Sequence, residues 1–302
     1  MFLYITILLS AFVGPARADF SVGGSFAAPG YGARAWGMGG AAIASIADEG
    51  AVYWNPAMLG LVGGHNFGIA YANLIPGVDA RQSYLAYAQP IKLGSADEPG
   101  LEYALHAVGA IYGNLVLELA DGQSYSENIL RISYAYTPLY FVSIGVSFAG
   151  LLTSSDIPNF GGKGTALDVG LRLALTREFT FAFVVRNVIS QLSFEDGTDF
   201  SLPRAVVFGI AYRPMANLVF EGDLESKYGG LSRAILGGEY TVYNEVLAVR
   251  AGAAALASGE NRSVPYLGAG VRFGGFHFDY AVDFDMEEAF DNSQRVSLGL
   301  EF

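Results

Sequence analysis

From residue 64 onward, the chain repeatedly places apolar residues at every second position. A period of two is the pattern of β-strands that have one apolar face. In the last segment, the apolar face consists of Val296, Leu298, Leu300 and Phe302. The opposite face of these segments mixes charged residues with glycine. The sequence therefore predicts an all-β protein whose strands each carry one apolar face.

The alternating pattern recurs in fourteen segments. They lie at residues 64–73, 79–91, 102–113, 126–137, 140–151, 164–176, 179–187, 202–213, 217–226, 232–243, 245–255, 263–273, 276–284 and 293–302. From the fourth segment on, short connections such as Gly274-Gly275 alternate with longer ones such as 152–163. Short turns that alternate with longer outer loops are typical of outer-membrane barrels. An even number of strands also brings both chain ends to the periplasmic side.

The composition favours a membrane barrel over other classes of protein. Hydrophobic residues make up 52% of the chain and charged residues 15%, whereas soluble domains carry about 25% charged residues. Past the N-terminus, no apolar run reaches the roughly 20 residues that a membrane helix needs. A sheet that crosses a bilayer must close on itself, because unpaired backbone amides are too costly in hydrocarbon. We therefore predict a transmembrane antiparallel β-barrel of fourteen strands, with the lipid bilayer around it.

The N-terminus has the features of a secretory signal peptide. Residues 2–13 form an apolar run that is too short to span a bilayer, and Ala16-Arg17-Ala18 follows as a cleavage site. We expect residues 1–18 to be removed on export. The predicted location is the outer membrane of a Gram-negative-type cell envelope.

Charge and cysteine content exclude several functions. The net charge is −12, which argues against a nucleic-acid partner, because nucleic acids are bound through Lys and Arg. Cysteine is absent, so neither disulfides nor thiolate metal sites are available. We expect no cofactor and no metal. The acidic loop with Asp285, Glu287, Glu288 and Asp291 could offer oxygen ligands to Ca²⁺, but a solvated outer loop is the favoured interpretation.

Catalysis is not expected. A nucleophile needs a base within hydrogen-bond reach, and the chain has only His65, His106 and His277. No G-x-S-x-G elbow is present. His277 shares a strand face with Asp279, and a histidine with a satisfied hydrogen bond in the lumen is the favoured interpretation. We therefore predict that the protein is not an enzyme.

Residues 19–63 lack the alternation. This stretch is rich in small residues and contains both tryptophans, Trp36 and Trp54. Its apolar content is too high for a disordered leader, and Gly and Ala allow backbones to approach closely. The simplest placement is inside the barrel, as a plug or hatch that precedes a barrel of residues 64–302.

Within this stretch, residues 32–41 (GARAWGMGGA) and 53–57 (YWNPA) carry a specific motif. The motif resembles the N-terminal signature of the FadL-type outer-membrane superfamily and looks most like its PorV/PorQ branch. The resemblance implies a luminal hatch and a non-enzymatic function. It marks as hatch or gating residues Gly37, Met38, Gly39, Gly40, Trp54, Asn55, Pro56 and Ala57.

Asn55-Pro56 also has a physical interpretation. Pro56 fixes its own φ and biases Asn55 away from the helical region, and Asn bonds readily to nearby backbone in turns. The pair could therefore fix a kink in a loop that keeps one shape within the lumen. Alternatively, it merely ends a short helix at 40–47 and leads into the first strand. The sequence leaves both interpretations open.

The polar strand faces place many charges in the lumen. They are Asp168, Arg172, Arg186, Glu221, Asp223, Glu225, Glu239, Arg250, Arg272, Asp279, Asp283, Arg295 and Glu301. An unpaired charge in a partly dry lumen is expensive, so we expect a structural network that holds the hatch rather than a selectivity filter. Glu221, Asp223 and Glu225 repel one another unless bound cations or neighbouring arginines neutralise their negative charges. A cation-lined channel wall is the alternative for these three.

The resemblance implies one of two functions. The first is a hatch-gated channel or transporter for small hydrophobic molecules, with such a molecule as ligand. The second is a PorV-like accessory or scaffold barrel, with proteins of a type IX-like secretion system as partners. The sequence does not identify the substrate.

Overall fold

The computed structural model describes residues 30–75, 80–91, 106–118, 122–156, 158, 160–227, 229–243, 246–256, 262–284 and 293–302. The predicted signal peptide, residues 19–29 and the acidic loop 285–292 lie outside this part of the chain. No helix among the described residues is long and apolar enough to cross a membrane.

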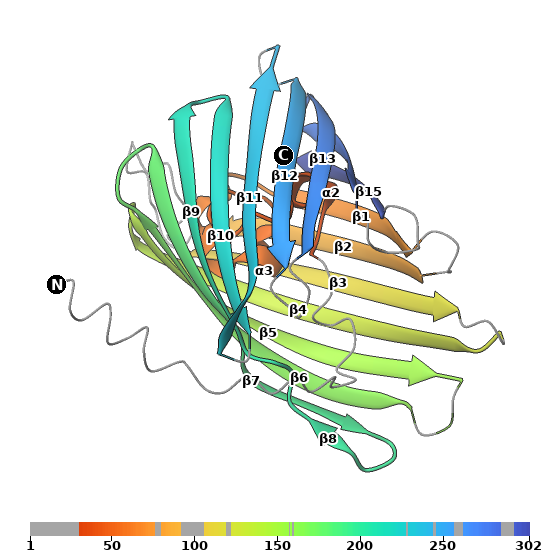
Figure 1. Cartoon of the computed structure of the whole chain (residues 1–302). Coiled ribbons are helices and arrows are strands. Elements are labelled where there is room, and N and C mark those ends of the chain that lie inside the picture. The colour runs from red at the N-terminus through yellow and green to blue at the C-terminus, as the bar shows by residue number, and fades with distance from the viewer. Residues whose placement is uncertain are drawn as a thin grey trace.

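The described chain forms one antiparallel sheet (Figure 1). Its strands are β1 Asn66–Ile75, β2 Ala80–Ile91, β3 His106–Glu118, β4 Ser124–Leu139, β5 Val142–Ser155, β6 Gly162–Ala174, β7 Phe179–Phe194, β8 Asp199–Phe200, β9 Ala205–Met215, β10 Leu218–Lys227, β11 Gly230–Val242, β12 Leu247–Leu256, β13 Arg262–Phe273, β14 Phe276–Asp283 and β15 Gln294–Glu301. Fourteen of them form the barrel wall, while the short β8 pairs only with the outer half of β7.

The wall closes through its first and last strands. β1 pairs with β15 from Asn66↔Glu301 to Asn73↔Gln294, and β6 pairs with β7. This closure confirms the fourteen-stranded barrel. Each predicted segment overlaps one barrel strand, because the period of two extends over the whole paired length. The largest difference is in β7, which continues to Phe194.

The two faces of the wall differ as the alternation predicts. On β1, Phe67 is 41% and Ile69 44% exposed, whereas Ala70 and Ala72, which point to the opposite face, are buried. The exposed face is apolar along the strands, which suits contact with lipid. Large aromatic residues beside the short turns, such as Tyr243 and Phe273, are also exposed. Aromatic residues at this level fit a membrane–water interface.

Residues 30–63, here called the luminal segment, cross the interior of the barrel. The segment contains α2 (Ala33–Gly37), α3 (Ala51–Trp54) and the 3₁₀ helix η2 (Pro56–Leu61). α2 packs against β12 to β15, and η2 packs against β2 to β6 on the other side of the lumen (Figure 1). The segment supplies the largest fully buried side chains, among them Met38, Ile43 and Met58. The hydrophobic core is therefore the interface between this segment and the inner face of the wall.

Residues 40–47 form turns and extended chain rather than a helix. The short helix that one of the two interpretations placed there is wrong, because the amides of Ala42 and Ala44 bond to Asp223 and Glu221 of the wall instead of to helical carbonyls. The helix that ends before Asn55 is α3.

Candidate functional site

Glycines of the wall let the luminal segment lie directly on the backbone of the sheet. A Cβ added to Gly37 would lie 2.9 Å from the Cα of Gly268. A Cβ added to Gly237 or Gly252 would overlap the backbone of Met38. Contact of this kind is only available to glycine. It fixes the first half of the luminal segment against β11, β12 and β13.

The Gly-Met-Gly-Gly motif ends α2. Gly39 has φ 75° and Gly40 φ 88°, in the left-handed region. The Gly39 amide donates to the Trp36 carbonyl at 2.8 Å and the Gly40 amide to the Ala35 carbonyl at 2.9 Å. This pair of bonds is the Schellman termination of a helix. The glycines of the motif thus reverse the chain and send residues 41–44 across the lumen.

Asn55 lies at the junction between α3 and η2. It follows α3 directly, and its Oδ1 accepts from the Ala57 amide at 3.0 Å, which caps η2. Its Nδ2 donates to the carbonyl of Ile43 at 2.9 Å and to that of Leu171 at 3.4 Å. The fully buried Asn55 amide therefore connects two parts of the luminal segment with β6.

The three acidic residues of β10 form hydrogen bonds or ion pairs with different partners. Glu221 Oε1 accepts from the Ala44 amide at 2.6 Å, and Asp223 Oδ2 accepts from the Ala42 amide at 3.0 Å. Glu225 forms an ion pair with Lys227 at 2.7 Å. Two of the carboxylates thus bond amides that would otherwise be unpaired in the extended part of the luminal segment.

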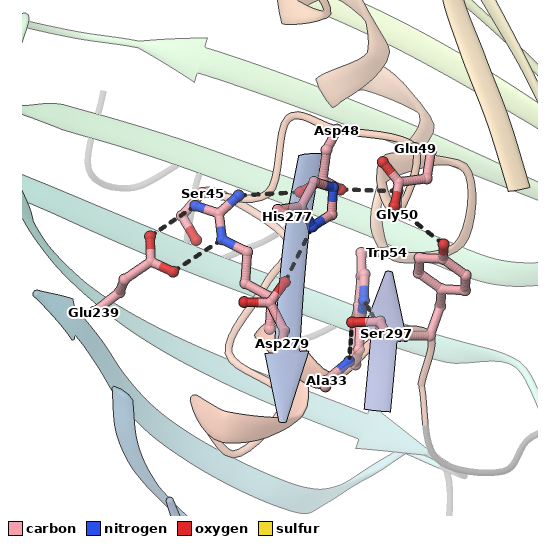
Figure 2. Close-up of polar contacts among 12 residues, drawn as sticks. Ala33, Ser45, Asp48, Glu49, Gly50, Trp54, Glu239, His277, Asp279 and Ser297 are labelled. Carbon is pink, nitrogen blue, oxygen red and sulfur yellow. Dashed lines mark hydrogen bonds and ion pairs between the residues drawn. The ribbon is translucent and has the colours of Figure 1, made fainter. Parts of the chain in front are cut away.

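A second group of charges fixes α2. The guanidinium of Arg34 lies 2.8 Å from Glu239, and Arg250 lies 2.6 Å from Glu239 and 2.7 Å from Asp279. Figure 2 shows Glu239, Asp279 and His277 in this cluster, with a hydrogen bond of 3.1 Å between His277 and Asp279. The chain of alternating charges joins the luminal segment to β11, β12 and β14.

Arg34 lies in the motif but was not among the predicted luminal charges, because no strand alternation marks it. Burial opposes its charge, but Glu239 and Asp48 outweigh burial and raise the pKa of Arg34 above its usual range. Beside it, burial and then the neighbouring Asp48 raise the pKa of Glu49 to about 7. The Tyr31 hydroxyl donates to Glu49 Oε1 at 3.1 Å. Glu49 is therefore a group of the luminal segment that changes charge near neutral pH.

Further charges lie where Trp36 and Tyr53 of the luminal segment face the wall. The Trp36 indole donates to Asp283 Oδ2 at 3.1 Å, and the Arg295 guanidinium lies 3.7 Å from the Trp36 ring centroid. Arg131 of β4 forms an ion pair with Asp168 of β6. Arg131 was also missed as a site residue, although its strand segment was predicted and its alternation places it inside.

Three of the predicted luminal arginines form no direct ion pair within the part of the chain that the structure describes. Among the described residues, Arg172, Arg186 and Arg272 make no ion pair. Arg172 donates to the Tyr140 carbonyl at 3.2 Å, near a short turn. Arg186 approaches the Trp54 carbonyl at 3.5 Å. Some of the predicted charges thus form ion pairs or hydrogen bonds around the luminal segment, whereas these three arginines stand apart and make no ion pair with a described residue.

The wall changes its pairing at Arg186. β7 pairs with β9 only as far as Arg186↔Ala205, and beyond this point it pairs with β8 instead. The β6–β7 register shifts between Leu167 and Val169, and Asn187 adopts φ 54°. The Asn187 amide donates to Asp168 Oδ1 at 2.8 Å. This irregularity places Arg186 where β7 separates from β9.

A cavity of about 390 Å³ opens between this irregularity and the luminal segment. This volume is within the range of small-molecule pockets, about 300–1,000 Å³. Aromatic rings and charges share its surface. Its lining includes Trp36, Ile43, Tyr53, Trp54, Tyr266, Arg131, Asp168, Arg186, Asp223, Glu225, Lys227, Arg233, Arg262 and Asp283.

The fold is similar to that of several solved outer-membrane channels. The monoaromatic hydrocarbon channel CymD is similar with a TM-score of 0.68 at 15% identity, over 90% of this chain and 98% of that one. The Pseudomonas putida toluene transporter TodX gives 0.65 at 14% identity, over 90% and 99%. A Pseudomonas aeruginosa FadL homologue gives 0.63 at 13% identity, over 90% and 98%. The chain has the fold of FadL-type channels.

The likeness is one of structure rather than sequence. No family model matches the chain, and no curated protein matches its sequence. The fold is the one that the resemblance to the FadL-type superfamily implied. The PorV/PorQ part of that resemblance stays a prediction.

Each of the three histidines is hydrogen-bonded to a tyrosine or an aspartate side chain. His65 and His106 bond to the hydroxyls of Tyr87 and Tyr134, and His277 bonds to Asp279. None of these bonds involves a serine. Within the described ranges, no cluster of histidine and acidic side chains suits a metal ion.

Proposed function

We propose that this protein is an outer-membrane channel for small hydrophobic molecules, in which residues 19–63 act as a hatch. The observation that carries the proposal is the cavity of about 390 Å³, whose inner side is formed by aromatic side chains of the luminal segment. The fold it shares with hydrocarbon channels supports the same function. In this proposal residues 1–18 are the cleaved signal peptide, and residues 64–302 form the barrel.

The paired charges hold the hatch in this proposal. Arg34, Glu239 and Arg250 join it to one side of the wall, and Glu221 and Asp223 join it to another. Passage requires the hatch to shift, because it fills the lumen beside the cavity. A small local movement is sufficient, since the cavity already reaches Trp36 and Trp54.

Uptake by whole cells tests the channel function. Cells that lack other channels of this fold are given radiolabelled toluene, and its initial uptake is compared with and without the protein. We expect faster uptake with the protein. Equal rates, with the folded barrel present in the membrane, would contradict the proposal.

A reversible lock tests the hatch. The Ala33 amide donates to Ser297 Oγ at 3.2 Å, so these two positions are close, and the chain has no cysteine of its own. We expect the oxidised Ala33→Cys, Ser297→Cys double variant to lose uptake and to regain it on reduction. The two single variants are controls, and a thiol assay verifies the disulfide. Normal uptake through the locked protein would show that α2 need not move.

The alternative of a PorV-like secretion barrel stays a prediction. It requires protein partners, which pull-down from native membranes would recover. The cavity favours the channel, because a scaffold has no need of one.

A further inference from the structure

Arg186 offers an unpaired guanidinium to the cavity. It makes no ion pair with any described residue, and among the described residues its one hydrogen bond goes to the Trp54 carbonyl, 3.5 Å from Nη2. Its Cζ lies 5.2 Å from the ring centroid of Tyr53 and 5.7 Å from that of Trp54. Stacking on rings occupies the face of a guanidinium and leaves its in-plane N–H groups available.

The nearest acidic residues of the lining have other partners. Asp168 is bonded by Arg131 and by the Asn187 amide. Glu225 is bonded by Lys227, and Asp223 accepts from the Ala42 amide. Arg186 therefore makes no direct ion pair with a described carboxylate, although Glu225 lies near enough to interact with its charge.

The charge balance of the cavity differs from that of the whole chain. Its described lining contains five cationic and four acidic side chains, although the chain has a net charge of −12. The cavity therefore attracts anions more than the protein as a whole does. A neutral hydrocarbon gains nothing from these charges and must displace the water that solvates them.

The aromatic side chains of the cavity indicate that the apolar part of its ligand is an aromatic ring. Trp54 and Tyr53 lie in an edge-to-face pair with centroids 5.2 Å apart, and Trp36 and Tyr266 form a second pair at 5.1 Å. A cavity of about 150 Å³ is large enough for benzene, so a volume of about 390 Å³ accommodates a substituted ring. Rings prefer such offset and edge-on arrangements.

We propose that the cavity binds small aromatic carboxylates, with the carboxylate on the in-plane N–H groups of Arg186 and the ring between Trp54 and Tyr266. This proposal rests on the proposed channel function and specifies its substrate class.

Towards the short-turn end, Arg172 and Arg213 are two further cations. They donate to backbone carbonyls of Tyr140 and Ser45, at 3.2 and 3.0 Å. An anion that passes the hatch thus meets positive charge again.

Tryptophan fluorescence measures this binding directly, because both tryptophans of the chain, Trp36 and Trp54, line the cavity. Benzoate is the probe, and toluene is a neutral control of similar shape. We expect purified protein to bind benzoate more tightly than toluene at neutral pH. Equal binding of the two, or no binding of benzoate, would overturn the proposal.

Substitution of Arg186 identifies the anion site. We expect Arg186→Gln to weaken benzoate binding about tenfold or more, as loss of a charged hydrogen bond implies, and to leave toluene binding unchanged. Arg186→Lys should give an intermediate affinity. Arg81→Gln, on the exposed face of β2, is the matched control and should bind benzoate normally. Unaltered benzoate binding by Arg186→Gln would overturn the proposal.

The two proposals fail separately. If toluene enters cells through the protein but benzoate does not bind, only the substrate class is wrong. If toluene uptake is the same with and without the protein, the channel function itself is wrong. Migration of the unheated variant on a denaturing gel verifies that Arg186→Gln still forms the barrel.

Discussion

The two sides of the lumen are built in opposite ways. Around α2, glycine backbones of β11 to β13 contact the luminal segment directly, and the charges of Arg34, Glu239, Arg250 and Asp279 satisfy one another. Around Arg186, the wall changes its pairing, a cavity opens and a guanidinium is left unpaired. The comparison teaches that the same segment is anchored on one side and borders a cavity on the other.

The largest loss of stability should come from replacing a glycine that contacts the luminal segment on its anchored side. In Gly252→Val, the new side chain overlaps the Met38 backbone, which cannot rotate away. We expect a loss of about 3–5 kcal/mol in the free energy of unfolding, or displacement of the luminal segment. Urea unfolding in lipid vesicles, together with trypsin cleavage after Arg34, measures both.

The control is Gly150→Val on β5, where a Cβ meets no described atom within 4 Å. It should change the free energy of unfolding by less than about 1 kcal/mol. Equal losses for both valine variants would mean that strand glycines matter in general and that the contact with Met38 does not.

The next effect concerns the charges of the anchored side. Glu239→Gln removes the carboxylate shared by Arg34 and Arg250. We expect it to cost about 3 kcal/mol, because loss of one member leaves buried charge uncompensated. The same change at Glu118, whose ion pair with Arg81 is exposed, should cost under about 1 kcal/mol. Unfolding midpoints compare the two, and similar midpoints would show that the lumen is as well hydrated as the outside.

The sequence predicted only some of the structural features on which these effects depend. The period of two located all fourteen barrel strands and the inward faces of Glu221, Asp223 and Arg250, because side-chain direction follows from strand geometry alone. Arg34 was missed as a site residue because the luminal segment has no period. The change of pairing at Arg186 was missed because a register shift leaves the alternation of each strand nearly intact. The cavity depends on both of these features.

The stability of the protein should also depend on pH through one carboxyl group of the luminal segment. Glu49 has a pKa of about 7 in the folded protein and about 4.5 when unfolded. Between these values the folded state binds more protons, so stability falls as pH rises through this window. We expect stability to be about 2 kcal/mol lower at pH 8 than at pH 5 through this group.

Urea unfolding at a series of pH values checks this slope. Glu49→Gln, which cannot ionise, should flatten the dependence and leave the stability at pH 5 nearly unchanged. A slope that persists in Glu49→Gln would assign the titration to another group of the lumen.

The smallest effect on stability should come from the cavity side. Arg186 has no ion pair to lose, so Arg186→Gln should change the free energy of unfolding by less than about 1 kcal/mol, even though we expect it to abolish most benzoate binding. The same urea measurement used for Glu239→Gln provides the comparison. A loss as large as that of Glu239→Gln would mean that Arg186 holds the luminal segment through its contacts with Tyr53 and Trp54. Both sides of the lumen would then be anchored, and the cavity would be a gap in packing rather than a binding space.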